Sequence, residues 1–502
     1  MIVVHEGCTL GIDIGTHGSK GVIVTKDGVV LEDSCCTHNL IIPKAGYAEH
    51  NAFSWWNDFV FLTKDLLQKT GIDNGSISAV GCSAIAPTML PLNSKGEPLR
   101  NAILYGIDNR AEKEISEMTE RIGEDKLLKY NGILLSSQAA GPKILWFMKN
   151  EPELFKKTAK IVTATTYLVY CLTGRSVIDY YTASTFNPLF DCRKKEWTDA
   201  LWPDAPLDLL SEITWTTDIV GEITGEAAKE TGLKEGTKVI AGTSDAASEA
   251  ISSGVVENGD LMIMYGTSSF FIEITDKLAK ADRNIWPTIF LQPEQYAIAA
   301  GMSTSGAVMS WFSDLLDGYS YQLLDRLAEE IPLGADGLLL LPYFSGERTP
   351  VNDPNARGVL VGLSLFHKKG HIFRAILEAI AYGIRDNIEN IEKAGLPVRR
   401  AVAIGGGTNS AVLLQIVSDV TKLDQLVPKI TLGACYGDAF LAGLGIGYNK
   451  SLKDILSWIE WDKKIIPIEK NSSLYDEYFK LYKELYRATS KVSHHLVAIS
   501  KR

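Results

Sequence analysis

Cysteine is scarce in this chain, and the few cysteines form no recognisable pattern. The 502 residues include only seven cysteines, and none of them belongs to a Cys-x-x-Cys pair. This scatter argues against a zinc ribbon or a disulfide framework and favours a reducing compartment. We therefore expect a cytoplasmic protein.

Long apolar runs and an excess of positive charge are missing as well. No stretch approaches 18 consecutive apolar residues, and the N-terminus lacks a basic segment followed by an apolar core. We therefore expect neither a transmembrane helix nor a signal peptide. Lys and Arg number 50 against 61 Asp and Glu, which gives a net charge of −11. A basic footprint is absent, so we expect no nucleic-acid or membrane partner.

What is present fits a soluble α/β protein of several domains. Hydrophobic residues make up 46% and charged residues 22% of the chain, and its length predicts two to four domains. Short β-rich apolar runs alternate with longer helical patterns, which favours α/β layers. The expected strands are residues 10–14, 21–25, 77–81, 239–241, 261–265, 338–341 and 402–404.

Three helices are predicted from their apolar spacing, and we assign all three stripes to core packing. The first ends at Gly71, and the third is a C-terminal helix expected to pack on the second domain. Their stripes are Phe53, Trp56, Val60 and Leu67; Phe373, Leu377, Ile380, Ile384, Ile388 and Ile391; and Leu474, Tyr478, Leu481, Tyr482 and Leu485.

One pattern occurs twice. Residues 10–14 lead into Gly15-Thr16 and return as residues 21–25, while residues 261–265 lead into Gly266-Thr267 and return as residues 270–275. Two copies of one fold facing each other would create a cleft, where ligands commonly bind. Two unrelated hairpins are the alternative. We predict domains at residues 1–254 and 255–448, followed by a helical tail at 449–502.

Two glycine-containing loops could hold phosphate groups. Asp13 to Lys20 follows a buried strand and offers backbone N–H groups, hydroxyls and one lysine, with Asp13 able to hold Mg²⁺ through water. Gly405, Gly406 and Gly407 follow a strand and open a helix, so a nucleotide could lie against the backbone. Neither loop is a P-loop, because no GxxxxGK[ST] run exists. A plain turn is the alternative for each.

Asp245 has two interpretations. It follows residues 239–244 at the end of a strand, where a carboxylate could accept a proton from an alcohol. It is also a good N-cap for a helix over residues 246–252. From the residues alone, the N-cap is the stronger interpretation.

Together these segments resemble the FGGY carbohydrate kinases of the actin-like ATPase superfamily, from about residue 10 to residue 448. Residues 358–363 followed by 371–378 fit the family's C-terminal signature, and residues 341–350 are also similar. Residues 143–150 fit the N-terminal signature, with Ala140 where a small polar residue or proline is usual. The resemblance implies two actin-like (ribonuclease H-like) ATPase domains across a cleft, and ATP-dependent, Mg²⁺-assisted phosphorylation of a sugar. On residues alone, Glu347 and Arg348 brace a loop.

The resemblance also implies roles for individual residues. Asp245 corresponds to the catalytic base, and Asp108 and Arg110 are similar to a sugar-binding stretch of the xylulokinase-like members. Ile85-Ala86-Pro87 stand where those members carry Gln-Met-His, so Ala86 and Pro87 would border the sugar, and Thr166 stands where an aspartate is common. The nucleotide and its metal would be bound by Asp13 (also the metal ligand), Gly15, Thr16, His17, Gly18, Ser19, Lys20, Gly266, Thr267, Gly306, Ser310, Gly405, Gly406, Gly407 and Asn409.

The resemblance predicts D-xylulose or a related ketopentose as the acceptor. Gluconate, ribulose and a polyol such as glycerol or erythritol are alternatives. Actin and the heat-shock chaperones share the ATPase core but bind protein partners, which gives a second class of function. A non-catalytic sugar sensor is disfavoured, because Asp13, Thr16, Asp245, Gly266 and Gly406 are all present. A homodimer is left open.

Overall fold

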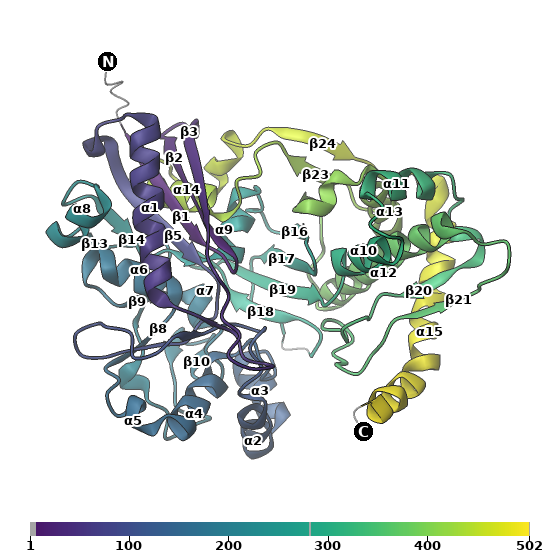
Figure 1. The fold of residues 1–502 in the computed structure, drawn as a ribbon, viewed down its shortest axis with the longest axis horizontal. Helices are drawn as coiled ribbons and strands as arrows, with labels where there is room; N and C mark the ends of the chain where they lie inside the picture. The colour runs from purple at the N-terminus through teal and green to yellow at the C-terminus, as the bar shows by residue number, and fades with distance from the viewer. Residues whose placement is uncertain (1–6, 281–282, 501–502) are drawn as a thin grey trace.

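The protein folds into two lobes, each built around one central sheet (Figure 1). The computed structural model describes residues 7–280 and 283–500. The α/β class is confirmed, and all the predicted strands are present, with ends shifted by at most a few residues.

The first sheet has the strand order β13-β14-β5-β1-β2-β3, with β15 pairing with β5. β1 and β2 form an antiparallel hairpin, whereas β1 and β5 run parallel. The bounds are β1 Cys8–Ile14, β2 Gly18–Thr25, β3 Val30–Thr37, β5 Ile77–Ala84, β13 Ile219–Glu222, β14 Lys238–Ile240 and β15 Thr243–Ser244.

The second sheet repeats this arrangement. Its order is β18-β19-β17-β16-β22-β23-β24, with β16 and β17 antiparallel and β16 and β22 parallel. The predicted repeat is therefore confirmed, because the two hairpins occupy equivalent positions in the two sheets. The bounds are β16 Asp260–Tyr265, β17 Ser269–Thr275, β18 Trp286–Ile289, β19 Tyr296–Met302, β22 Arg400–Ile404, β23 Gln425–Pro428 and β24 Trp461–Ile465.

Helices cover both sheets, and short strand pairs lie outside them. The helices are α1 Ala52–Thr70, α2 Glu112–Ile122, α3 Glu124–Asn131, α4 Ala140–Asn150, α5 Pro152–Phe155, α6 Ala164–Thr173, α7 Tyr180–Ala183, α8 Gly225–Thr231, α9 Asp245–Ser252, α10 Gly306–Leu315, α11 Tyr321–Glu329, α12 Lys369–Lys393, α13 Ala411–Thr421, α14 Ala434–Gly445 and α15 Glu469–Ser500. The short pairs are β4 Glu49–His50 with β7 Ala102–Ile103, β6 Leu90–Leu92 with β8 Lys160–Val162, β9 Val177–Asp179 with β12 Glu212–Thr214, β10 Phe190–Asp191 with β11 Glu196–Trp197, and β20 Leu339–Leu341 with β21 Val359–Val361.

The three predicted helices exist, but two of the predicted faces were only partly right. α1 ends at Gly71 as predicted, with a left-handed φ of 62°. However, its buried face runs through Trp55 and Phe59, while Phe53 is 53% exposed. α15 packs on α12 and α13 of the second lobe and buries Tyr482, both as predicted. However, it also buries Tyr475 and Phe479, while Leu474 and Leu481 are exposed. Both helices carry neighbouring apolar stripes, and the packing partner decides which one is buried.

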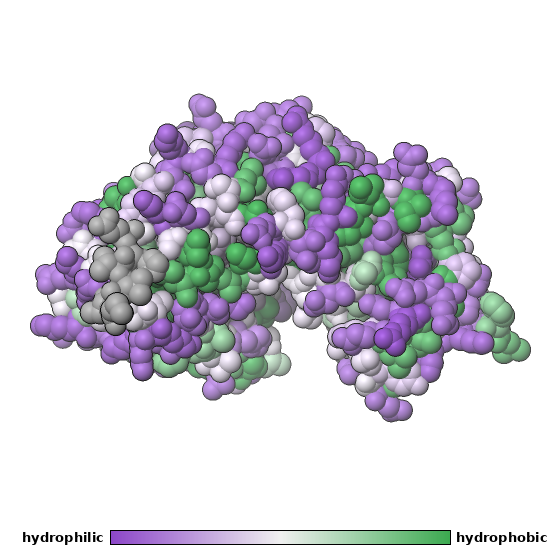
Figure 2. Space-filling model, turned by 90° about the horizontal axis from the view of Figure 1, so that it is seen from above, coloured by the Kyte–Doolittle hydropathy of each residue, from purple (hydrophilic) through white to green (hydrophobic). Residues whose placement is uncertain are grey.

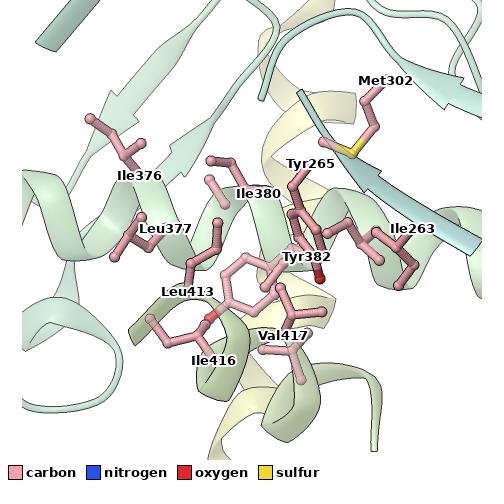
Figure 3. Close-up of a cluster of buried hydrophobic side chains, with 14 of the residues drawn as sticks. Ile263, Tyr265, Met302, Ile376, Leu377, Ile380, Tyr382, Leu413, Ile416 and Val417 are labelled. Carbon is pink, nitrogen blue, oxygen red and sulfur yellow. The ribbon is translucent and has the colours of Figure 1, made fainter. Parts of the chain in front are cut away.

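α12 buries its predicted stripe completely and forms the centre of the second lobe's core. Figure 3 shows Leu377 of this helix beside Leu413 of α13, and Tyr382 above Ile416 and Val417 of the same helix α13. Burial of such side chains supplies most of the stabilisation of a core.

α14 joins the two lobes. It comes late in the chain, yet it packs on β1 and β5 of the first sheet and on α9 (Figure 1). A Cβ atom on Gly11 would lie 1.9 Å from the carbonyl oxygen of Cys435, and one on Gly81 would lie 2.2 Å from that of Asp438. Glycine at both positions therefore lets the helix lie directly on the strands.

The surface between the lobes is indented, and most of what is visible from above is hydrophilic (Figure 2). Across residues 7–280 and 283–500, no helix is long and apolar enough to cross a membrane.

Candidate active site

A cavity of about 290 Å³ lies where the two lobes meet. Asp245 and Glu249 of α9 border it from the first lobe, and Met264 of β16 and Arg348 border it from the second. Ala86 and Pro87 lie in its wall, at the position predicted to border the sugar. Its lining also includes the apolar Ile85, Ile133, Leu134, Phe270, Trp286 and Pro287 and the polar Tyr105, Ser136, Gln138, Asn187, Ser268 and Thr288.

Asp245 is the first residue of α9, and its helix is capped by the preceding residue. The Ser244 hydroxyl accepts a hydrogen bond from the backbone N–H of Ala247. The interpretation of Asp245 as N-cap is therefore wrong. Its Oδ1 accepts from the N–H of Ala246 at 2.8 Å, which fixes the carboxylate at the cavity wall. Burial raises the pKa of Asp245 to about 6, so it is mostly ionised at neutral pH and can accept a proton.

Further carboxyl groups surround the end of β1. Burial raises the pKa of Asp13 well above its usual range, and neighbouring acidic groups, Asp245 above all, contribute to the rise. Burial also raises the pKa of Glu249 to about 7. Neither Glu249 nor Asp438 was predicted from the sequence as part of the site. Asp438 could have been noticed, because it is the lone charged residue in the apolar segment of α14.

The turn between β1 and β2 carries most of the predicted first phosphate loop. Gly15 donates its N–H to the carbonyl of Gly18 at 2.9 Å, while His17 and Lys20 are exposed. Thr16 shares a 2.9 Å hydrogen bond with Tyr105, one of the cavity residues.

Ser19 lies differently from the rest of this turn. Its side chain is 1% exposed and donates to Asp58 at 2.6 Å. Its hydroxyl is therefore already used within the fold, and its predicted contact with phosphate stays a prediction.

The predicted nucleotide residues of the second lobe are brought together at the β16–β17 turn. The N–H of Gly306, at the start of α10, donates to the carbonyl of Gly266 at 3.0 Å, and that of Ala307 donates to Thr267 at 2.9 Å. Ser310 lies one turn further along α10. The arrangement joins a hairpin turn to a helix N-terminus, which suits an anion.

The triple-glycine loop lies against the same hairpin. A Cβ atom on Gly405 would approach the carbonyl oxygen of Tyr265 to 2.7 Å, and one on Gly407 would approach its Cβ to 2.6 Å. Gly406 has open space beside it, and Asn409 donates to the carbonyl of Gly406 at 3.0 Å. The outer two glycines are thus required by packing, whereas Gly406 leaves room for a ligand.

Asp108 and Arg110 lie away from the cavity lining. Asp108 is fully buried, accepts from the N–H of Ala48 at 2.6 Å and pairs with the Arg110 guanidinium at 2.7 Å. Arg110 also bonds Glu49 at 2.8 Å. In this structure both side chains stabilise the loop behind Tyr105, and their contact with the sugar stays a prediction.

Arg348 combines the loop-bracing role expected of it with a place in the cavity wall. Its Nη2 donates to the carbonyl of Met302 at 2.7 Å, and its Nε is buried with no hydrogen-bond partner among the described residues. Glu347 accepts from the N–H groups of Ser303 and Arg348 and does brace the loop. The second lobe therefore supplies a cation to the cavity.

The predicted metal position does not form a protein-only metal cage. No group of three or more His, Cys, Asp or Glu side chains that could hold a metal is found in residues 7–280 and 283–500. Mg²⁺ typically binds one or two carboxylates, several waters and substrate phosphates. A single carboxylate such as Asp13, beside other acidic groups, fits that mode of binding.

Comparison with known proteins assigns both halves of the chain to one family. Residues 8–252 match the N-terminal domain of the FGGY family of carbohydrate kinases, and residues 261–446 match its C-terminal domain.

Individual relatives match over nearly the whole length. The chain is 30% identical over 500 residues to the xylulose kinase of Bacillus subtilis, covering 98% of this chain and 99% of that protein. The crystal structure of xylulose kinase from Rhodospirillum rubrum has a TM-score of 0.91 and 28% identity, covering 97% and 100% of the two chains. The gluconate kinase structure from Lactobacillus acidophilus has a TM-score of 0.90 and 26% identity, covering 96% and 98%.

Proposed function

This chain belongs to the FGGY family of carbohydrate kinases and is a sugar kinase, and we propose that its acceptor is D-xylulose or a closely related ketopentose. The near full-length similarity to xylulose kinases supports this choice. The hydroxyls and amides of Tyr105, Gln138 and Asn187 in the cavity wall are groups that bind sugar hydroxyls.

The observation that carries the proposal is the position of Asp245 in the cavity wall. Its carboxylate takes the proton from the attacking sugar hydroxyl as the oxygen attacks the γ-phosphorus of ATP. The bond from that phosphorus to the β,γ-bridging oxygen breaks, and ADP leaves. Positioning and charge stabilisation supply most of the rate in phosphoryl transfer.

ATP is placed by the second lobe in this proposal. The turn at Gly266-Thr267 and the N-terminus of α10 meet the phosphates, and the open space beside Gly406 receives the adenosine side. Asp13 would hold the Mg²⁺ that accompanies the nucleotide. When bound, the ion neutralises charge on the phosphates.

An aldonate such as gluconate is the second candidate. Arg348 places a cation in the cavity wall, and a carboxylate is a good partner for a guanidinium. The similarity to a gluconate kinase structure supports the same idea. The polyols glycerol and erythritol remain as further acceptors to test, whereas ribulose, itself a ketopentose, falls within the first candidate class.

A coupled assay of ADP release over ketopentoses, polyols and aldonates tests the acceptor. We expect the highest kcat/KM with D-xylulose or a close ketopentose. Faster turnover of gluconate or glycerol than of every pentulose would contradict the proposal. ATP hydrolysis that no sugar stimulates, but that a protein partner does, would instead favour the actin-like class.

A further inference from the structure

Asp438 is a buried acid that no step of the proposed reaction uses. It is the one charged residue of α14, and its side chain is 1% exposed. No salt bridge to it is found in residues 7–280 and 283–500. An unpaired buried carboxylate is costly, so a buried acid without a cation tends to be neutral.

Two serines from different elements hold the Asp438 carboxyl group. Ser83 Oγ, at the end of β5, lies 2.7 Å from Asp438 Oδ2 and 3.1 Å from Asp13 Oδ1. Ser248 Oγ, on the helix that begins at Asp245, lies 2.7 Å from Asp438 Oδ1. Asp438 thus contacts, through one serine each, the strand that carries Asp13 and the helix that carries Asp245.

The number of available protons constrains this cluster. The Ser83 hydroxyl carries a single proton, but two carboxyl oxygens lie within hydrogen-bond distance of it. Both contacts are satisfied only when one carboxyl group also carries a proton. A protonated Asp438 supplies the missing proton, because its hydroxyl donates to Ser83 and Ser83 then donates to Asp13. The Ser248 hydroxyl also lies 2.9 Å from the carbonyl oxygen of Ala434, so its one proton is shared between that carbonyl and Asp438 Oδ1.

The surrounding charges agree with a neutral Asp438. Burial, with a smaller contribution from the charge of Asp245, raises the pKa of Asp438 to about 8. The titratable groups around the cluster are Asp13 on β1, Lys20 on β2, Cys82 on β5, Asp245 and Glu249 on α9, and Cys435 on α14. Lys20 is the one cation among them, and it is exposed.

We propose that Asp438 is a positioning residue that acts as a neutral acid, orienting Asp13 through Ser83 and the Asp245 helix through Ser248. The inference rests on the proposed function, in which Asp13 and Asp245 serve the phosphates and the acceptor. It gives α14 a role in the site, although none of its residues borders the cavity.

The test compares Asp438→Asn, Asp438→Ala and Ser83→Ala with the wild type. Asn is neutral and donates from Nδ2, so it should rescue kcat to within about threefold of the wild type. Asp438→Ala and Ser83→Ala should each lower kcat by about 10- to 100-fold, because small misplacements at a reacting centre are costly. A variant that combines Asp438→Ala with Ser83→Ala should be no slower than the slower of the two single variants, since both changes break the same chain of hydrogen bonds.

Asp419→Ala is the matched control for loss of a buried aspartate. Asp419 lies in α13 and accepts from the N–H of Ile468 at 2.7 Å, outside the cavity lining. The Asp419→Ala substitution should lower the melting temperature and leave kcat unchanged. Wild-type kcat in Ser83→Ala, or a loss in Asp438→Asn equal to that in Asp438→Ala, would overturn the proposal.

A second readout works without turnover. The rise in melting temperature caused by Mg²⁺ and ADP should be smaller in Asp438→Ala and Ser83→Ala than in the wild type, and preserved in Asp438→Asn. Equal rises in all variants would contradict the inference about Asp438. Lack of turnover in the wild type with every sugar would instead contradict the proposed function.

Discussion

The two hairpins of this protein occupy equivalent places but carry different residues. Asp13 lies two residues before Gly15 in the first hairpin, and its neighbour on the parallel strand β5 is Ser83. Met264 lies two residues before Gly266 in the second hairpin, and its neighbour on the parallel strand β22 is Ile404. The backbone repeats, while one pair is polar and the other is apolar.

The difference separates structural repetition from chemistry. The polar pair is part of the cluster of acids next to Asp245, whereas Met264 forms part of the cavity wall. The duplicated sheet therefore gives two similar turns, which we propose as phosphate-binding turns, but only the first sheet carries an acid at this strand position. Variants of the two lobes test this difference.

The largest effect should come from removing the base of the first lobe. Asp245→Asn keeps the Oδ1 that accepts from Ala246 but cannot accept the hydroxyl proton. We expect kcat to fall by about 10²- to 10⁴-fold, with melting temperature and ATP binding retained. Steady-state kinetics and thermal melting measure this, with Asp419→Asn as a control that keeps its turnover. Wild-type kcat in a folded variant would end the case for Asp245 as the base.

The two equivalent strand positions can be compared directly. Asp13→Asn should lower kcat by about 10²-fold, because it removes charge from the phosphate and metal position. Met264→Leu conserves volume and should cost less than about 1.5 kcal/mol of stability while keeping kcat. Equal losses of kcat in both variants would show that the two hairpins are not specialised in this way.

The glycine loop separates nucleotide binding from packing within the second lobe. Gly406→Val should raise the KM for ATP by about tenfold with little change in the sugar KM, because its side chain enters open space that the nucleotide needs. Gly407→Val should instead lower the melting temperature, since its Cβ would lie 2.6 Å from the Cβ of Tyr265. Unchanged nucleotide affinity in a folded Gly406→Val variant would show that this loop does not bind the adenosine.

The smallest expected effect is a pH dependence centred on the first lobe. Asp245 must be ionised to act as base, so kcat/KM should fall on the acidic side and reach half its plateau at a pH of about 6. Because folding raises the pKa of Asp245, the contribution of this residue to the free energy of unfolding is lost as pH rises from about 4 to 6. A Glu249→Gln variant with the same acidic limb would assign that limb to Asp245.

Much of the fold was predictable because it depends on local patterns. Alternating strands and helices, the repeated hairpin and the α12 stripe all follow from spacing along the chain. The buried faces of α1 and α15 could not be predicted fully, since each helix carries two adjacent apolar stripes. Trp55 rather than Trp56 is fully buried because the first sheet and α6 determine which stripe faces inward.

The site was predictable where it lies on turns and less so where it depends on long-range packing. The loops at Gly15, Gly266 and Gly406 stand beside strand ends, which a sequence reveals. Arg348 in the cavity wall and Asp438 beneath Asp13 depend on contacts between distant segments. Spacing alone carries no information on such contacts.

The late position of α14 in the chain also affects the order in which the protein can be completed during synthesis. When a ribosome has released residues 1–252, β1, β5 and α9 exist, but the helix that covers them has not yet been made. Val22, Val24 and Ala79 share a core with Ala439 and Phe440, so their apolar surface waits for residues 434–445. The first lobe, although encoded first, becomes complete only after most of the second has emerged.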